Sequence, residues 1–336
     1  MDRFKNILVT GGAGFIGSNF LNHMIIKYSD VNFINLDLLT YAGNLDYLNV
    51  VKDYPNYFFI EGDISDSKLV TSIFKKYSVD GVINFAAESH VDNSIGNPSD
   101  FIKTNINGTF NLLKVAYDSW MISPFKHKSG FLHSRFHQVS TDEVYGSIEQ
   151  GSFNENSAYN PSSPYSSSKS SADLIVKSFN KTYGLNTTIS LSSNNFGPNQ
   201  NREKFIPVVL NSILNNVPVP VYGDGKNIRD WIFVDDNCKI IELIFKKGLS
   251  GESYNIGGGN EISNLDLIDL IFNSIITCSK NITDYQINFI DDRFGHDRRY
   301  SVNNSKIISD LGWSNDFSNF HKSLDFYVKN YINSHF

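Results

Sequence analysis

Two residues in the middle of the chain have the types and the spacing that acid–base chemistry needs. Tyr165 and Lys169 are four residues apart at the start of a predicted helix, so they share one helix face. A lysine ammonium beside a phenol stabilises the phenolate and lowers its pKa, which makes it a base for a hydroxyl proton while a hydride leaves the same carbon. The Y-x-x-x-K spacing is common, so it indicates this chemistry only together with a dinucleotide site.

A second reactive group ends the predicted strand His137–Thr141. Ser140 and Thr141 stand where ligands of open α/β sheets bind, and Thr141 can hydrogen-bond a reacting oxygen. Asp142 and Glu143 follow, and adjacent carboxylates can act as one acid and one base. The spacing is equally compatible with an N-cap aspartate and a first-turn glutamate that stabilise a helix end.

The sequence TGGAGFIG at Thr10–Gly17 predicts the dinucleotide site, because its glycines follow a predicted strand and open a predicted helix. Glycine permits the turn and lets the backbone approach a pyrophosphate. Asp37, at the end of the next strand, can accept both ribose hydroxyls and would repel a 2′-phosphate, so NAD is favoured over NADP. Asp63 can accept from the adenine amino group. The alternative is that the glycines only pack helix on strand and that both aspartates belong to turns.

The elements around these groups alternate between short apolar runs and longer amphipathic segments. Such alternation is typical of βαβ units with a parallel sheet. The sequence therefore predicts an α/β fold, a Rossmann-type doubly wound parallel sheet with a smaller, interleaved C-terminal substrate-binding lobe. The predicted strands are Asn6–Thr10, Val31–Asp37, Tyr57–Glu61, Gly81–Ala87, His137–Thr141 and Thr187–Ser192, and the predicted helices are Phe15–Tyr28, Ser67–Tyr77, Asp100–Trp120 and Pro164–Tyr183.

The regular alternation breaks after about residue 193. A loop rich in Asn, Gly and Pro is predicted at Asn194–Asn201, and a basic, irregular insertion is predicted at Ser123–Arg135. Helices are predicted again at Asp235–Lys247, Asn264–Thr277 and Phe317–Tyr331. We expect an NAD-binding domain formed by residues 1–193 with about 228–257, and a substrate-binding lobe formed by residues 194–227 and 258–336.

Composition and charge exclude several classes of protein. The 336 residues are 40% hydrophobic and carry a formal net charge of −6, which argues against nucleic-acid binding. The two cysteines, Cys238 and Cys278, have no metal-type spacing, so neither a metal site nor a disulfide framework is expected. No signal segment or apolar run of membrane-spanning length is found, so we expect a cytoplasmic protein without a membrane partner.

The same motifs resemble the extended short-chain dehydrogenase/reductase superfamily and, within it, the dTDP-glucose 4,6-dehydratases. The glycine loop, Asp37 and the Tyr165/Lys169 pair carry the wider resemblance, and the Asp142–Glu143 pair distinguishes the dehydratases from related epimerases. The matching segments follow one another along almost the whole chain: Phe85–Ile95, His137–Gly146, Tyr165–Asp173, Ser193–Pro198, Glu203–Pro207, Tyr222–Asp236 and Gly295–Tyr300.

The resemblance implies a reaction and a set of site residues. It implies dehydration of dTDP-glucose to dTDP-4-keto-6-deoxyglucose by C4 oxidation, elimination of water across C5 and C6, and hydride return to C6 with bound NAD. The implied catalytic residues are Thr141, Asp142, Glu143, Tyr165 and Lys169. The implied cofactor-binding residues are Gly11, Gly14, Phe15, Ile16, Gly17, Asp37, Leu38, Thr40, Asp63, Ile64, Ala86, Ala87, Ser89, Thr104, Ser140, Tyr165, Lys169 and Asn194. The implied substrate-binding residues are His90, Thr141, Asn194, Glu203, Lys204, Arg229, Asn264, Arg293, His296 and Tyr300.

Two departures from the family pattern lie near the predicted nucleotide pocket. Phe294 stands where a proline is usual, and Asn199–Arg202 replaces aromatic or apolar residues. The alternatives are a 4,6-dehydratase for another nucleotide sugar such as UDP-glucose, a nucleotide-sugar epimerase, or a non-catalytic NAD sensor on the same fold. The resemblance also implies a homodimer built on the helices Asp100–Trp120 and Pro164–Tyr183.

Overall fold

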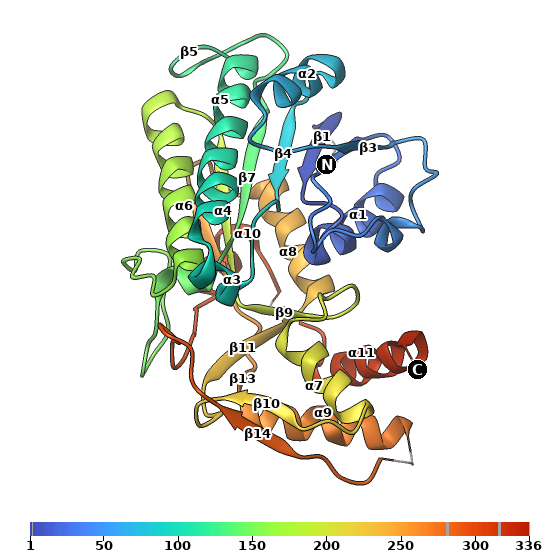
Figure 1. Ribbon diagram of the computed structural model, residues 1–336. Helices are drawn as coiled ribbons and strands as arrows, with labels where there is room; N and C mark the ends of the chain where they lie inside the picture. The colour runs from blue at the N-terminus through green and yellow to red at the C-terminus, as the bar shows by residue number, and fades with distance from the viewer. Residues whose placement is uncertain (2, 280–281, 315–316, 336) are drawn as a thin grey trace.

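The centre of the computed structural model is a parallel seven-stranded sheet with the order β3-β2-β1-β4-β7-β8-β12 (Figure 1). The structure describes residues 1, 3–279, 282–314 and 317–335. This order reverses between β1 and β4 and confirms the doubly wound Rossmann-type prediction. The seventh strand, β12, was not among the predicted strands. The strands are β1 Asn6–Thr10, β2 Asn32–Asp37, β3 Tyr57–Glu61, β4 Gly81–Asn84, β7 Arg135–Thr141, β8 Thr187–Ser192 and β12 Ser253–Ile256.

Helices cover both faces of this sheet. On one face, α1 (Phe15–Lys27) packs against α8 (Val234–Lys247), and on the other, α5 (Thr109–Trp120) lies between α2 (Ser67–Tyr77) and α6 (Pro164–Tyr183). Because both faces are covered, most positions of the central strands are buried, although β7 and β8 carry several buried polar side chains such as His137 and Ser190. None of the helices in the described residues combines the length and the apolar character needed to cross a membrane.

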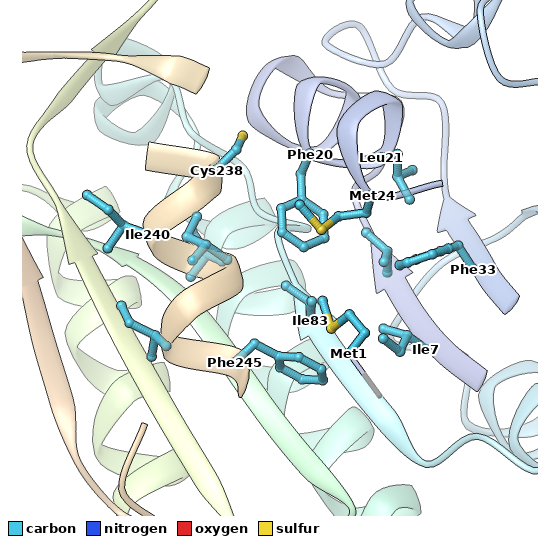
Figure 2. Close-up of a cluster of buried hydrophobic side chains, with 14 of the residues drawn as sticks. Met1, Ile7, Phe20, Leu21, Met24, Phe33, Ile83, Cys238, Ile240 and Phe245 are labelled. Atoms are coloured by element: carbon cyan, nitrogen blue, oxygen red, sulfur yellow. The ribbon is translucent and has the colours of Figure 1, made fainter. Parts of the chain in front are cut away.

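The core under α1 shows how the first helix is fixed to the sheet (Figure 2). Phe20 and Met24 point from α1 into the space between α1 and α8, where Phe245 of α8 and Ile7 of β1 also lie. Ile240 of α8 belongs to the same buried cluster. All five side chains are fully buried. Burial of each such side chain contributes about 1.5–3 kcal/mol, so the helix that begins at the glycine loop has little freedom to move.

The helix α6, which carries Tyr165 and Lys169, has clear signals at both ends. Ser163 accepts a hydrogen bond from the backbone N–H of Ser166, and the Ser166 hydroxyl accepts one from the Ser163 backbone N–H. Pro164 follows at the first helical position, where its missing N–H is not needed. Gly184 ends the helix in the left-handed conformation, with φ of 71°. These local signals explain why the predicted bounds are correct.

The predicted helix Asp100–Trp120 is confirmed as helical throughout, but it is not a regular α-helix. The chain instead forms α4 (Pro98–Phe101), a π-helical segment at Ile102–Gly108 and then α5. Gly108 lies against Ile64, and a Cβ at this position would be 2.5 Å from the Ile64 Cδ1 atom. The wider turn therefore occurs where the helix packs closely on the loop after β3. The strand predicted at Gly81–Ala87 is also too long, because β4 ends at Asn84.

The predicted irregular insertion contains regular structure. Met121–Ser123 (β5) and Lys126–His127 (β6) form a short antiparallel hairpin whose turn places Phe125 at a φ of 61°. Arg135 belongs to β7, and its guanidinium donates to the carbonyls of Ile244 and Phe245 at the end of α8. A buried arginine that satisfies the free carbonyls of a helix end has a structural role.

The smaller lobe has two short sheets and its own apolar core, which lies below the main sheet in Figure 1. Within the predicted loop 194–201, residues 194–196 form the strand β9. The expected division of the chain into two domains stays a prediction. β11 pairs with β9 and β13 of the smaller lobe, while α10 packs against α8 and β12 of the main sheet. The elements are β9 Asn194–Phe196, α7 Phe205–Leu214, β10 Val219–Tyr222, β11 Ile228–Phe233, β13 Glu261–Ser263, α9 Asn264–Cys278, β14 Ile287–Ile290, α10 Ser305–Leu311 and α11 Phe320–His335.

Candidate active site

A cavity of about 330 Å³ opens at the carboxyl ends of the central strands, where open α/β sheets bind their ligands. It continues from the glycine loop to the ends of β7 and β8 and to the first residues of the smaller lobe. All five predicted catalytic residues line it, as does Lys204. All the predicted cofactor-binding residues line it as well: Gly11, Gly14, Phe15, Ile16, Gly17, Asp37, Leu38, Thr40, Asp63, Ile64, Ala86, Ala87, Ser89, Thr104, Ser140, Tyr165, Lys169 and Asn194.

The glycine loop leaves room for a ligand because side chains are absent from it. Gly11 has a φ of 69°, and a Cβ there would be 2.6 Å from the backbone nitrogen of Ala86. A Cβ at Gly17 would be 2.3 Å from the Gly11 carbonyl oxygen. The first turn of α1 has no side-chain cap at Gly14, so its N–H groups are available to an anion.

Asp37 stands at the ribose end of the cavity. Its two carboxylate oxygens accept hydrogen bonds from the backbone N–H groups of Ala13 and Leu39, each at 2.9 Å. Burial raises the pKa of Asp37, and these two backbone hydrogen bonds oppose that effect. The glycine cradle and this fixed acceptor fit a dinucleotide that has free ribose hydroxyls. Asp63 also lines the cavity, where it is paired with Lys103 at 2.9 Å and accepts from the Ser65 N–H.

Tyr165 and Lys169 are both buried in the floor of the cavity. Burial raises the pKa of Tyr165, the Glu143 carboxylate raises it further, and a hydrogen bond with Thr141 lowers it. The expected net lowering of the phenol pKa is therefore wrong for this environment. Lys169 donates to the Val139 carbonyl at 2.7 Å, and burial lowers its pKa to about 8. The lysine can thus lose or keep its proton near neutral pH.

The Asp142–Glu143 pair does not cap a helix with its side chains. Thr141 is the N-cap of the short 3₁₀ helix Asp142–Tyr145, and its hydroxyl accepts from the Glu143 N–H at 3.2 Å. Asp142 is 2% exposed, and its Oδ2 atom has no hydrogen-bond partner among the described residues. Because the capping role belongs to Thr141, the two carboxyl groups are left free to face the cavity.

The two carboxyl groups differ in their surroundings. Burial raises the pKa of Asp142 well above its usual range, and the Glu143 charge adds to this rise. Burial also raises the pKa of Glu143, but the cations of Arg293, Arg229 and Lys204 act against the rise. Burial therefore favours the protonated form of Asp142, whereas in Glu143 three cations oppose the effect of burial and favour the carboxylate.

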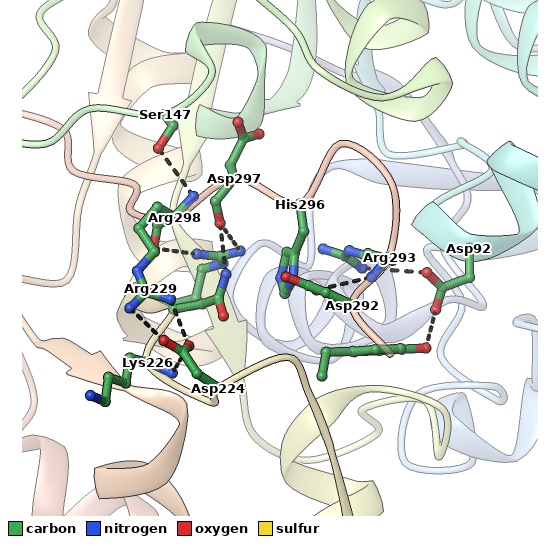
Figure 3. A network of polar contacts seen from close by, with 12 residues as sticks. Asp92, Ser147, Asp224, Lys226, Arg229, Asp292, Arg293, His296, Asp297 and Arg298 are labelled. Carbon is green, nitrogen blue, oxygen red and sulfur yellow. Dashed lines mark hydrogen bonds and ion pairs between the residues drawn. The ribbon is translucent and has the colours of Figure 1, made fainter. Parts of the chain in front are cut away.

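Part of the predicted substrate-binding set forms a polar network in the smaller lobe (Figure 3). The Arg229 guanidinium donates to the Asp297 carbonyl at 2.9 Å and lies 4.3 Å over the Tyr300 ring. Arg229 is thus held by the backbone carbonyls of Ile228, Asp297 and Arg298. Arg293 lies 3.6 Å from Asp92, and His296 contacts Asp292 at 2.6 Å. The Arg229 and Arg293 cations belong to the electrostatic surroundings of Glu143, although they do not line the cavity itself.

The remaining predicted contacts divide into two groups. Lys204 lines the cavity and donates to the Ser89 carbonyl at 2.8 Å, whereas the adjacent Glu203 has a buried Oε1 atom without a partner among the described residues. His90 is the N-cap of α3 (Val91–Gly96), where its Nδ1 accepts from a backbone N–H at 3.3 Å. Asn264 begins α9. Neither His90 nor Asn264 lines the cavity.

The departures from the family pattern have different surroundings. Phe294 is 87% exposed on the loop between Arg293 and His296. Asn199 has a φ of 66° and donates from Nδ2 to the Ser18 hydroxyl at the start of α1. Gln200 and Asn201 line the cavity. The polar segment 199–202 therefore connects the smaller lobe to the helix of the glycine loop.

Several residues of the site were not predicted from the sequence. Asn105, in the π-helical segment, binds the backbone N–H and carbonyl of Glu88 and the Ser168 hydroxyl. Trp231 lines the cavity from the smaller lobe. Asp173 accepts a hydrogen bond from Ser140 at 2.6 Å. Its position four residues after Lys169 was the one available signal, because it places both side chains on one helix face.

One cavity of a Rossmann sheet holds the glycine loop, the ribose carboxylate and the Tyr165/Lys169 pair. This combination defines a dinucleotide-dependent enzyme of the extended short-chain dehydrogenase/reductase class. The family model described as GDP-mannose 4,6 dehydratase matches residues 8–322. The chain is 46% identical over 317 residues to the dTDP-glucose 4,6-dehydratase of Neisseria gonorrhoeae, a match that covers 92% of this chain and 90% of the relative. This chain belongs to the dTDP-glucose 4,6-dehydratase family.

Two further comparisons agree with this assignment. The chain is 44% identical over 339 residues to the dTDP-glucose 4,6-dehydratase of Salmonella typhimurium, covering 96% of this chain and 93% of the relative. A crystal structure of a dTDP-glucose 4,6-dehydratase from Streptomyces venezuelae, solved with NAD bound, superposes with a TM-score of 0.88 at 41% identity. That match covers 98% of this chain and 97% of the other, so the similarity includes both lobes.

Proposed function

We propose that this protein converts dTDP-glucose to dTDP-4-keto-6-deoxyglucose with NAD held throughout turnover. The observation that carries the proposal is the Asp142–Glu143 pair, whose members have different surroundings in the same cavity as Tyr165 and Lys169. Oxidation alone needs only the tyrosine and the lysine. An additional acid and base are what the removal of water requires.

The residues of the cavity fit NAD. The glycine loop and the first turn of α1 would hold its pyrophosphate, and Asp37 would hold the adenosine ribose. When bound, NAD would supply the acceptor for the hydride from sugar C4 and the donor for its return to C6. Since the reaction has no net redox change, the protein has no need to exchange its cofactor between turnovers.

The protein's own side chains handle the protons. Tyr165 takes the proton of the sugar O4 hydroxyl. Burial raises the pKa of this phenol, and the Lys169 ammonium on the same helix face would act against that rise. A ketone at C4 acidifies the C5 proton, and the Glu143 carboxylate takes it. Asp142, whose pKa is raised by burial, donates a proton to the departing C6 hydroxyl, so that water leaves. Thr141 orients the Tyr165 hydroxyl through the hydrogen bond between them.

The substrate assignment depends on the anchors and on the relatives. Arg229 and Arg293 supply guanidinium groups for a diphosphate, and Tyr300 keeps the Arg229 plane in place. The relatives named above act on dTDP-glucose according to their names. UDP-glucose is the first alternative, because Phe294 and residues 199–202 depart from the family pattern near this end of the site.

We also propose a homodimer and a cytoplasmic location. Helices α5 and α6 lie side by side and expose Phe110 (48%) and Leu174 (58%) on the surface. Two such helices from each of two copies would bury these side chains in a symmetric interface. Cys238 and Cys278 are free thiols, which suits a reducing compartment.

The experiment is incubation of the purified protein with dTDP-, UDP- and GDP-glucose in deuterium oxide, followed by mass spectrometry and proton NMR. We expect dTDP-glucose to lose one water and to gain one solvent deuterium at C5. The Glu143→Gln variant should give neither change, because it lacks the C5 base. An isomer of unchanged mass without deuterium at C5 would indicate an epimerase and refute the proposal. Dehydration of UDP-glucose alone would change the assigned substrate from dTDP-glucose to UDP-glucose.

A further inference from the structure

Asp173 is a carboxylate that the proposed reaction does not use, although it lies directly behind the catalytic groups. It is located one turn after Lys169 on α6 and has an exposed fraction of 0%. One of its oxygens, Oδ2, accepts from the Ser140 hydroxyl at 2.6 Å and from the Tyr159 hydroxyl at 3.5 Å. The other, Oδ1, has no hydrogen-bond partner among the described residues. A carboxylate in this situation needs a positive charge nearby.

Two lysines of the same helix supply that charge. Lys169, four residues before Asp173, is buried and donates to the Val139 carbonyl at 2.7 Å. Lys177, four residues after it, donates to the Tyr159 hydroxyl at 3.2 Å and lies 4.6 Å from the centre of that ring. Lys169, Asp173 and Lys177 therefore form a row of charges on one helix face. Asp173 is in the middle of this row, and the catalytic Lys169 is at the end that lies in the cavity.

Ser140 gives the carboxylate a second connection to the site. It belongs to β7 and directly precedes Thr141, which hydrogen-bonds Tyr165. The Ser140–Asp173 hydrogen bond thus joins the end of β7 to α6 at the level of Lys169. Movement of α6 along the strand would break this bond, so the bond helps to fix the distance between Thr141 and the Tyr165/Lys169 pair.

We propose that Asp173 is a positioning residue of the active site, which keeps Lys169 in its ammonium form by charge and fixes α6 to the end of β7 through Ser140. The inference rests on the proposed function, since it assigns Asp173 a part in the step for which Lys169 must be charged. Asp173 touches neither the reacting atoms nor the cavity. Its effect passes through Lys169 and through the backbone that carries Tyr165.

The charge balance gives the direction of the effect. Burial lowers the pKa of Lys169 to about 8, and the Asp173 charge raises it against that effect. Burial raises the pKa of Asp173 to about 6, so Asp173 is ionised at the pH at which Lys169 titrates. Loss of the carboxylate should therefore neutralise Lys169 at a lower pH.

The titratable groups that interact with Asp173 come from three segments: Lys169, Lys177 and Tyr165 on α6, Tyr145 in the 3₁₀ helix after β7, and Tyr159 in the loop before α6.

The test compares wild type with Asp173→Asn, Asp173→Glu and the matched control Tyr159→Phe. We expect Asp173→Asn to move the alkaline limb of the kcat/KM profile to lower pH by about one unit, which corresponds to a roughly tenfold loss above pH 8. KM should stay close to wild type while kcat falls. Asp173→Glu should restore much of the profile. Tyr159→Phe removes the hydroxyl that contacts both Asp173 and Lys177 but removes no charge, so it should leave the profile unchanged.

A second readout is independent of turnover. The titration of Lys169 can be followed by NMR of protein with ¹³C-labelled lysine, where the Lys169 signal is the one lost in Lys169→Arg. Its midpoint should fall in Asp173→Asn, whether or not the enzyme accepts dTDP-glucose. A normal midpoint and an unshifted pH profile in a folded Asp173→Asn protein would overturn the proposal. If that variant does not fold, Asp173→Ser removes the same charge with a smaller side chain and gives the same test.

Discussion

Asp142→Asn is the change that best separates chemistry from stability in this protein. Asp142 is 2% exposed, and burial raises its pKa well above the usual range, which favours the protonated, uncharged side chain. An amide of the same size replaces one neutral group with another. The hydrogen bond from Thr141 is long, at 3.4 Å, so little binding energy is lost. We expect the free energy of unfolding to change by less than about 1 kcal/mol.

The effect on turnover should be much larger. An asparagine cannot give a proton to the departing C6 hydroxyl, and loss of a general acid costs about 10²–10⁴ in rate. This range corresponds to about 3–5 kcal/mol in the barrier, several times the expected change in stability. The assay is steady-state product formation from dTDP-glucose, together with urea unfolding of the same preparation. We expect kcat to fall while KM stays near the wild-type value.

Asp236→Asn is the matched control for this prediction. Asp236 is equally buried, but its carboxylate accepts from the Ser318 N–H at 2.7 Å and pairs with Lys239 at 3.3 Å, away from the cavity. Its replacement should cost about 1–3 kcal/mol of stability and leave the turnover of folded protein almost unchanged. The reasoning is refuted if Asp142→Asn dehydrates dTDP-glucose at the wild-type rate, or if both variants lose activity in proportion to stability.

Three other predictions follow from the cavity, its buried charges and the exposed helices. Asp37→Asn should weaken NAD binding about 10–100-fold and reduce the preference over NADP, as measured by calorimetry on cofactor-free protein. Burial raises the pKa of Asp173 from 3.8 to about 6, so between these pH values the folded state keeps a proton that the unfolded state has lost. The free energy of unfolding, relative to that of Asp173→Asn, should therefore fall by about 3 kcal/mol as pH rises through this window, as measured by urea titration. Phe110→Asp with Leu174→Asp should sediment as a folded monomer; a persistent dimer would contradict the proposed interface.

The parts of the fold that depend on local signals could be predicted from the sequence. The bounds of α6 follow from Ser163, Pro164 and Gly184, and the ends of β1 follow from its apolar run and the glycine loop. The position of the cavity could be predicted too, because parallel strands bring the glycine loop and Thr141 to the same edge of the sheet.

Other features depend on contacts between distant residues, which no local pattern encodes. The π-helical turn at Ile102–Gly108 lies where Gly108 packs so closely on Ile64 that a Cβ would not fit. The direction of the Tyr165 pKa shift depends on burial and on the nearness of Glu143, and a spacing of four residues specifies neither. Arg229 is held by the Asp297 carbonyl, 68 residues away along the chain, so its orientation could not be deduced from its own neighbours.

The path of the chain between the two parts of the molecule has a mechanical consequence. The backbone leaves the main sheet after β8, returns from β11 into α8, leaves again between β12 and β13, and returns once more at α10 before ending in α11. Several covalent connections therefore join the parts, and no single linker can serve as a hinge. Closure over a substrate is restricted to small sliding movements. A single proteolytic cut would leave both parts attached, and heat should melt them in one cooperative transition.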